Sequence, residues 1–280
     1  NRAVLRLMVA LNRIADSATY LRREVELTPA EKRGASFLGI TQLYSNASDK
    51  PLAADVVEQA LDGSLKDPQN GPVAWASIGH LRLIADQKPA ALQALQNGEK
   101  LNPGSSAIAL LAMELLEAGS AEVEPLVQRY LDKNPSPQLR MGFARLLIGQ
   151  KRFADAKKQI QTITTESPEF PEAWAVLANL QLQDKELDAA QQSINQFAAL
   201  QPKLPEGVAR KAGLAQLNLL QADLAEKRNR YDEADAYLQR IPDAANLLSV
   251  QARRADLLAR QGKIQEARAI IRAVPADGPN

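Results

Sequence analysis

Hydrophobic and small residues recur along this chain with the spacing of helices, and the whole pattern returns after 34 residues. The block 171–204 aligns with the block 137–170 without a gap. Small residues stand at the eighth and twentieth positions of both blocks, where they let two helices approach closely. A proline at position 32 cannot continue a helix interior, so each block predicts a helix pair that ends there. The matched residues are Phe143 and Leu177, Ala144 and Ala178, Ala156 and Ala190, Ile160 and Ile194, and Pro168 and Pro202.

The same offsets extend the pattern in both directions. Trp75 and Trp174 take the fourth position of their blocks and set the register. Downstream, the spacing widens to 44 residues between Ala190 and Ala234, and the period then resumes, with Val274 near the end of the final block. The predicted repeats are 72–105, 106–136, 137–170 and 171–204, with two further repeats in 205–280.

The pattern is weaker toward the N-terminus and ambiguous after residue 204. Within 1–71, segments near 30–45 and 52–65 pair as a divergent unit, and 1–27 contains one or two helices. Apolar residues at steps of three and four suit one long first helix over 205–228, with Pro205 in its first turn. Two helices with a kink near Gly213 fit this segment equally well.

A 34-residue period with this tryptophan and proline punctuation resembles the tetratricopeptide repeat, a helix-turn-helix unit. The resemblance implies an all-α fold, a right-handed α-solenoid of stacked helix pairs. Such units bind other protein chains and rarely carry out chemistry. We therefore expect a protein or peptide partner.

Two C-terminal segments, 225–242 and 250–268, resemble the large exported tetratricopeptide-repeat proteins of Gram-negative bacteria. Members of that family are longer than this chain and carry an N-terminal export signal. The resemblance implies a periplasmic or envelope location, with a cytoplasmic one as the alternative. Because the chain begins at Asn1 and ends at Asn280 within the repeat pattern, we expect a fragment or a processed chain.

In such repeats the first helices line a concave groove, and set positions of each first helix supply the ligand contacts. Chaperone-binding relatives hold a C-terminal carboxylate with a lysine at position five and an asparagine at position nine. Here Asn179 follows Ala175, so this mode is not expected. The candidate groove residues are His80, Glu114, Arg145, Asn179 and Asp223, with Met141 and Leu182 as apolar neighbours.

Composition argues against the other function classes. Thirty-four basic and thirty-three acidic residues give a net charge of +1, whereas nucleic-acid binders usually carry a basic excess that neutralises phosphates. Without cysteine, and with His80 as its single histidine, the chain offers no thiolate zinc site, cysteine nucleophile or histidine cluster. No apolar run approaches the roughly 20 residues that a bilayer span needs.

These observations predict a non-catalytic scaffold for a protein or peptide partner, with no metal, cofactor, nucleic acid or membrane span. Two alternatives remain: a helical-repeat RNA binder, and a non-catalytic part of a larger enzyme or assembly factor. A homodimer through the solenoid ends, by residues 1–27 or the C-terminal helix, also stays open.

Overall fold

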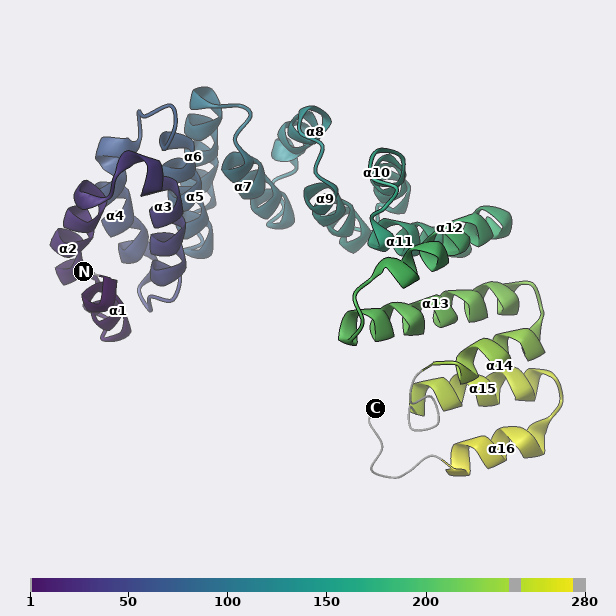
Figure 1. The fold of residues 1–280 in the computed structure, drawn as a ribbon. Coiled ribbons are helices and arrows are strands. Elements are labelled where there is room, and N and C mark those ends of the chain that lie inside the picture. The colour runs from purple at the N-terminus through teal and green to yellow at the C-terminus, as the bar shows by residue number, and fades with distance from the viewer. Residues whose placement is uncertain (1, 242–247, 274–280) are drawn as a thin grey trace. The chain divides into compact units, whose positions relative to one another are not determined.

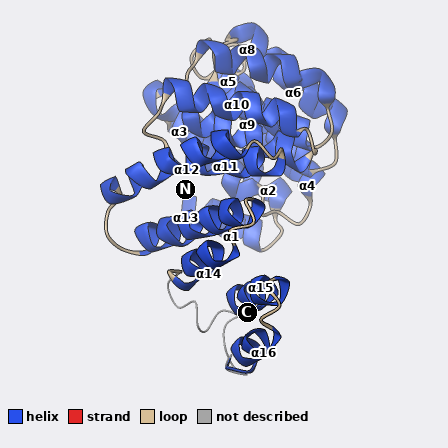
Figure 2. Cartoon of the chain, turned by 90° about the vertical axis from the view of Figure 1, so that its right-hand side faces the viewer, coloured by secondary structure: helices blue, strands red, loops and turns tan. Residues whose placement is uncertain are grey.

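The computed structural model describes residues 2–241 and 248–273. Two compact units make up the chain, residues 1–135 (unit 1) and residues 136–280 (unit 2). Throughout the described residues the secondary structure is helical and no strand is present (Figure 2). The predicted all-α class is therefore confirmed. Val274, which the sequence places near the end of the last repeat, lies outside the described residues.

Unit 1 contains four successive helix pairs, drawn in purple to teal in Figure 1. The pairs are α1 (Arg2–Ala10) with α2 (Ile14–Leu27), α3 (Ala30–Tyr44) with α4 (Lys50–Leu61), α5 (Gly71–Ile84) with α6 (Lys88–Leu101), and α7 (Ser106–Glu117) with α8 (Glu124–Lys133). Among the first helices of the pairs, α5 packs against both α3 and α7, and among the second helices α2 packs against α4. This stacking gives a continuous face formed by α3, α5 and α7.

Unit 2 likewise contains four pairs in its described residues, drawn in teal to yellow in Figure 1. The pairs are α9 (Pro137–Gly149) with α10 (Phe153–Glu166), α11 (Pro171–Gln183) with α12 (Leu187–Leu200), α13 (Val208–Lys227) with α14 (Tyr231–Gln239), and α15 (Leu248–Arg260) with α16 (Ile264–Ala273). Successive pairs pack through α10 against α11, α11 against α13, and α14 against α15. Each pair thus contacts its neighbours in the stack.

Small residues lie where helices cross. Ala156 and Ala190 are fully buried, and a Cβ added to Gly79 of α5 would collide with the Leu111 side chain of α7. The two tryptophans form hydrogen bonds with the loops between repeats. The indole N–H of Trp174 donates to the Pro168 carbonyl at 2.8 Å. Trp75 donates in the same way to the Leu65 carbonyl at 3.1 Å. The two tryptophans thus tie each first helix to the connection before it.

Tight turns with one residue in the left-handed conformation join the two helices in most pairs. In the α11–α12 turn the Glu186 N–H donates to the Gln181 carbonyl at 2.8 Å, which closes the end of α11. The α9–α10 turn repeats this bond between Arg152 and Leu147 at 2.9 Å. The left-handed residues are Asn12, Asp86, Gly119, Lys151, Lys185, Asn229 and Gly262.

The segment 205–228 forms one helix, α13, whose 20 residues run from Val208 to Lys227. Gly213 lies within this helix, which continues through it without a break. A Cβ at this position would collide with the Gln201 side chain. The predicted helix start at Pro205 is wrong, since α13 begins at Val208. Gly207, just before the helix, has a φ of +130°, a backbone conformation that glycine adopts readily.

Candidate partner-binding groove

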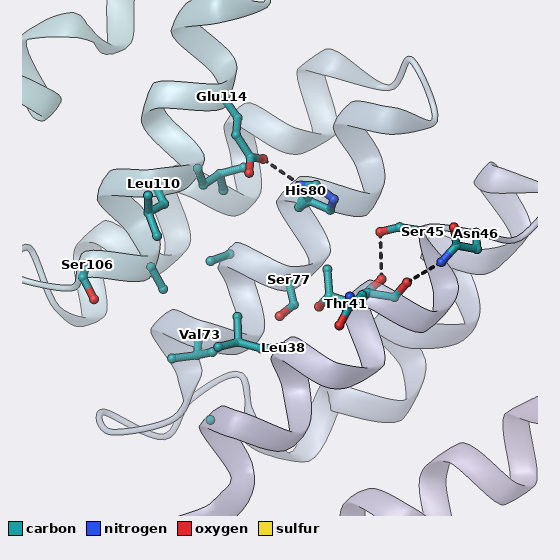
Figure 3. A pocket seen from close by; sticks show the side chains of 15 residues that line it. Leu38, Thr41, Ser45, Asn46, Val73, Ser77, His80, Ser106, Leu110 and Glu114 are labelled. Atoms are coloured by element: carbon teal, nitrogen blue, oxygen red, sulfur yellow. Dashed lines mark hydrogen bonds and ion pairs between the residues drawn. The ribbon is translucent and has the colours of Figure 1, made fainter. Parts of the chain in front are cut away.

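A groove of about 640 Å³ opens on the face that α3, α5 and α7 form in unit 1 (Figure 3). Fifteen residues line it, and each of the three helices contributes several of them. We call this surface the α3–α5–α7 groove. It arises because the first helices of three successive repeats pack side by side, so that one face of each remains uncovered by the second helices.

Exposed leucines form the apolar sides of the groove. Leu38 of α3 is 60% exposed, and Leu110 of α7 is 47% exposed. Between them, α5 supplies the half-buried Val73 and the buried Ala76. Ligand sites are commonly concave and mostly apolar, with a few polar groups. The groove is therefore a candidate binding surface.

A charged pair lies in the same groove. The Nδ1 atom of His80, on α5, lies 2.8 Å from Oε2 of Glu114, on α7 (Figure 3). Both side chains keep access to solvent, with 33% and 41% of their surfaces exposed. The hydrogen bond with the Glu114 carboxylate raises the pKa of His80 above its ordinary value, against the opposing effect of partial burial.

Apart from Leu38, the side chains that α3 and the turn after it contribute to the groove are polar and neutral. Thr41 and Ser45 donate their hydroxyl hydrogens to carbonyls of α3 itself, those of Phe37 and Thr41, at 2.8 and 2.7 Å. Asn46 donates its side-chain amide to the Gln42 carbonyl at 2.9 Å. Of the fifteen described residues that line the groove, only His80 and Glu114 are ionisable.

The structure brings together two of the candidate residues and corrects two others. His80 and Glu114, predicted as equivalent positions of successive repeats, contact each other in the groove. Met141 and Leu182 are core residues, 2% and 1% exposed, so their assignment to the groove surface is wrong. Met141 packs in a buried cluster with α10 and α11, and Leu182 packs in one with α12 and α13.

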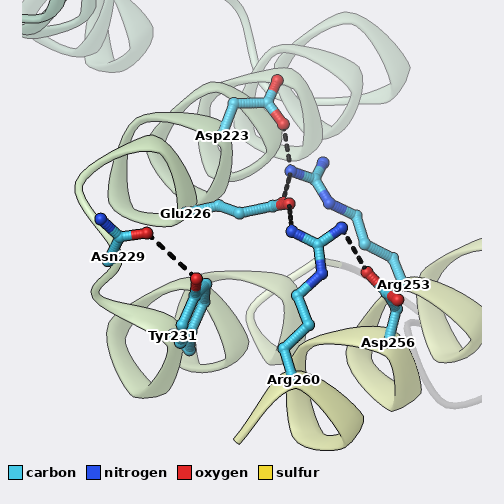
Figure 4. Close-up of polar contacts among 7 residues, drawn as sticks. All are labelled: Asp223, Glu226, Asn229, Tyr231, Arg253, Asp256 and Arg260. Atoms are coloured by element: carbon cyan, nitrogen blue, oxygen red, sulfur yellow. Dashed lines mark hydrogen bonds and ion pairs between the residues drawn. The ribbon is translucent and has the colours of Figure 1, made fainter.

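The remaining candidates lie in unit 2. Arg145 of α9 is exposed and forms an ion pair with Glu172 of α11, and Asn179 of α11 is also exposed. Asp223 of α13 pairs with Arg253 of α15 (Figure 4). Arg145 and Asp223 thus each form an ion pair within the fold, and all three residues stay predictions for a partner surface.

The ion pair of Asp223 belongs to a larger network between α13 and α15 (Figure 4). Arg253 also contacts Glu226 at 2.8 Å, and Arg260 contacts Glu226 at 3.0 Å and Asp256 at 2.8 Å. Two arginines of one repeat thus hold two carboxylates of the preceding repeat. This arrangement supports a structural role for Asp223.

Leu38, Thr41 and Ser45 line the groove although none was a candidate. Leu38 and Thr41 belong to α3 and Ser45 follows its last residue, in the part of the sequence where the repeat pattern is weak. The period that located His80 and Glu114 gave no register there. The described residues contain no cluster of three metal-ligating side chains. Within them, no helix has the length and apolar character that crossing a bilayer requires.

A family model described as tetratricopeptide repeat matches residues 147–217, from the end of α9 to the middle of α13. This match agrees with the tetratricopeptide repeat that the 34-residue period resembles. The matched segment includes the repeat 171–204, which carries the proline and tryptophan punctuation most completely. Tetratricopeptide repeats generally act as non-catalytic scaffolds for protein–protein interaction, which agrees with the open groove of unit 1.

Two solved tetratricopeptide-repeat structures share the fold. A tetratricopeptide repeat protein from Parabacteroides merdae ATCC 43184 is 18% identical, with a TM-score of 0.55 over 75% of this chain and 80% of that chain. The C-terminal part of a TPR repeat-containing protein from Cytophaga hutchinsonii is 13% identical, with a TM-score of 0.54 over 97% and 99% of the two chains. Likeness at these identities shows the fold alone. No curated protein matches this chain in sequence.

Proposed function

We propose that this protein is a non-catalytic scaffold that binds a peptide segment of a protein partner in the α3–α5–α7 groove. The observation that carries the proposal is the pair of exposed leucines, Leu38 and Leu110, on two sides of an open hollow. Full burial of an exposed leucine contributes about 1.5–3 kcal/mol, and each of these half-exposed leucines contributes about half of that on binding. An apolar strip with a few oriented polar groups suits a bound peptide.

The neutral and acidic character of the groove argues against nucleic acid. Neither lysine nor arginine is among the fifteen described residues that line it, whereas nucleic-acid sites draw most of their affinity from basic side chains. The exposed Arg145 and Asn179 of unit 2 are a second surface at which the partner can be tested. The resemblance of 225–242 and 250–268 to exported repeat proteins supports a periplasmic or envelope location.

The proposal predicts that groove leucines, and not exposed leucines in general, hold the partner. A Leu38→Asn, Leu110→Asn double variant removes both apolar sides of the groove. Leu11→Asn is a matched control, because Leu11 is also 60% exposed and does not line the groove. Partners are captured with the wild-type chain from native cells, purified, and titrated against each variant.

We expect the double variant to weaken partner binding more than tenfold, because two leucine burials are lost. The Leu11 variant should bind within about twofold of the wild type, as a change outside the interface does. Equal binding by the double variant and the wild type would contradict the groove as the docking site. Weakened binding by an Arg145→Ala, Asn179→Ala variant alone would move the site to unit 2.

A further inference from the structure

We propose that the α3–α5–α7 groove selects peptide segments in which a basic side chain accompanies a large apolar one, with Glu114 as the acceptor for the basic group. This inference rests on the proposed function and adds the chemistry of the ligand. Leu110 and Glu114 are four residues apart on α7, and both line the groove. Residues four apart on a helix lie about 6 Å from each other on one face. A single ligand segment can therefore contact both.

Charge decides which ligand fits. Glu114 and His80 are the only ionisable residues among the fifteen described groove residues, and neither lysine nor arginine is present to receive a carboxylate. The Glu114 side chain is 41% exposed. A carboxylate offers about four acceptor positions, so Glu114 can accept a second donor beside His80. A lysine or arginine of the ligand supplies both the donor and the compensating charge.

The position of His80 makes this selection dependent on pH. Among the described residues that line the groove with His80, Glu114 of α7 is the only other ionisable one, and those from α3 and the turn after it are neutral. Protonated His80 competes with a cationic ligand for the Glu114 carboxylate and repels it. As the pH rises through the raised pKa of His80, the competing charge disappears. A basic peptide therefore binds more tightly at pH 8 than at pH 5.5.

Selection from a library of random 12-residue peptides displayed on phage, with the full wild-type chain as the target, tests this inference. We expect the recovered peptides to carry a lysine or arginine within four positions of a leucine, methionine or aromatic residue. A recovered peptide is then synthesised with its basic residue and with glutamine in that place. Dissociation constants are measured by fluorescence anisotropy at pH 5.5 and pH 8.

Matched variants of the chain separate charge from packing. Glu114→Gln keeps the shape and should weaken the basic peptide more than fivefold while leaving the glutamine analogue within twofold. Glu117→Gln is the control, since Glu117 is exposed on the same helix and does not line the groove. His80→Gln should remove the difference in affinity between the two pH values.

Each outcome counts for or against the inference. Peptides that need Leu110 and bind the Glu114→Gln variant as well as the wild type would overturn the selection for a basic group, and would leave the scaffold function standing. A consensus rich in aspartate or glutamate would overturn it in the same way. Recovered peptides that bind a Leu110→Asn variant as tightly as the wild type, or no enrichment at all, would contradict both the inference and the groove as a binding site.

Discussion

At the residue scale, most turns inside the helix pairs contain one residue in the left-handed backbone conformation, although the type of residue differs from turn to turn. Gly119 and Gly262 adopt the left-handed conformation where glycine is favoured, while Lys151 and Lys185 adopt it with side chains that disfavour it. The left-handed conformation costs a residue with a Cβ roughly 1–2 kcal/mol. The repeat tolerates this cost because the hydrogen bonds across the turn and the packing of the two helices stabilise the turn conformation.

A substitution pair at the turns measures that cost. Lys185→Gly should stabilise the fold by about 0.5–1 kcal/mol, because relief of the left-handed strain exceeds the added freedom of the unfolded chain. Gly262→Ala should destabilise it by about 1 kcal/mol, and no steric clash adds to the backbone strain because a Cβ there meets no atom within 4 Å. Urea denaturation gives both values. Destabilisation by Lys185→Gly would contradict this explanation.

The His80–Glu114 pair predicts a pH dependence of stability. Because the pKa of His80 is raised in the fold above its ordinary value of 6.5, the protonated pair stabilises the fold fully below pH 6.5. This contribution is lost as the pH rises through the raised pKa. Thermal unfolding of the wild type and of His80→Gln, compared from pH 5 to pH 8.5, measures it. The difference between the two proteins should shrink as the pH rises, and a constant difference would contradict the prediction.

The candidate residues show what a sequence period can and cannot specify. His80 and Glu114 are 34 residues apart, so one period places them at equivalent points of neighbouring helices, and the structure joins them. The predictions for Met141 and Leu182 were wrong because only a small rotation about the helix axis separates a position at the edge of the groove face from one in the core. Leu38 was missed because its own repeat has diverged from the pattern.

At the element scale, small residues decide how closely the two helices of a pair approach. Ala190 of α12 is fully buried in a cluster with Ala178 and Leu182 of α11. The sequence predicted this closeness because alanine recurs at the same offset in neighbouring repeats. The single helix α13 was beyond prediction, since steps of three and four residues continue through Gly213 whether or not the helix bends there.

Enlarging a small residue at such a crossing tests the packing. Ala190→Leu should overpack the α11–α12 pair and lower the free energy of unfolding by about 1–3 kcal/mol. Ala189→Leu is a suitable control, because Ala189 is the neighbouring residue of the same helix and is only partly buried. Urea denaturation compares the two variants. An unchanged stability for Ala190→Leu would count against the repeat register.

At the scale of the whole molecule, the chain divides into two units, each a stack of helix pairs that contact neighbouring pairs. In such stacks stability is approximately a sum over repeats and their interfaces. The regular period predicted the repeated helix pairs of 72–204, whereas the division after residue 135 has no signal in the sequence beyond the shortened repeat at 106–136. The groove belongs to unit 1 alone.

Hydrogen–deuterium exchange of the full chain, with and without its purified partner, tests the central claim most directly. If the α3–α5–α7 groove docks the partner, exchange should slow in peptides that cover α3, α5 and α7. Peptides from the second helices α4 and α6 should change less, because these helices contribute none of the groove residues. Slower exchange confined to unit 2, or no change in α3, α5 and α7 at saturating partner, would contradict the account.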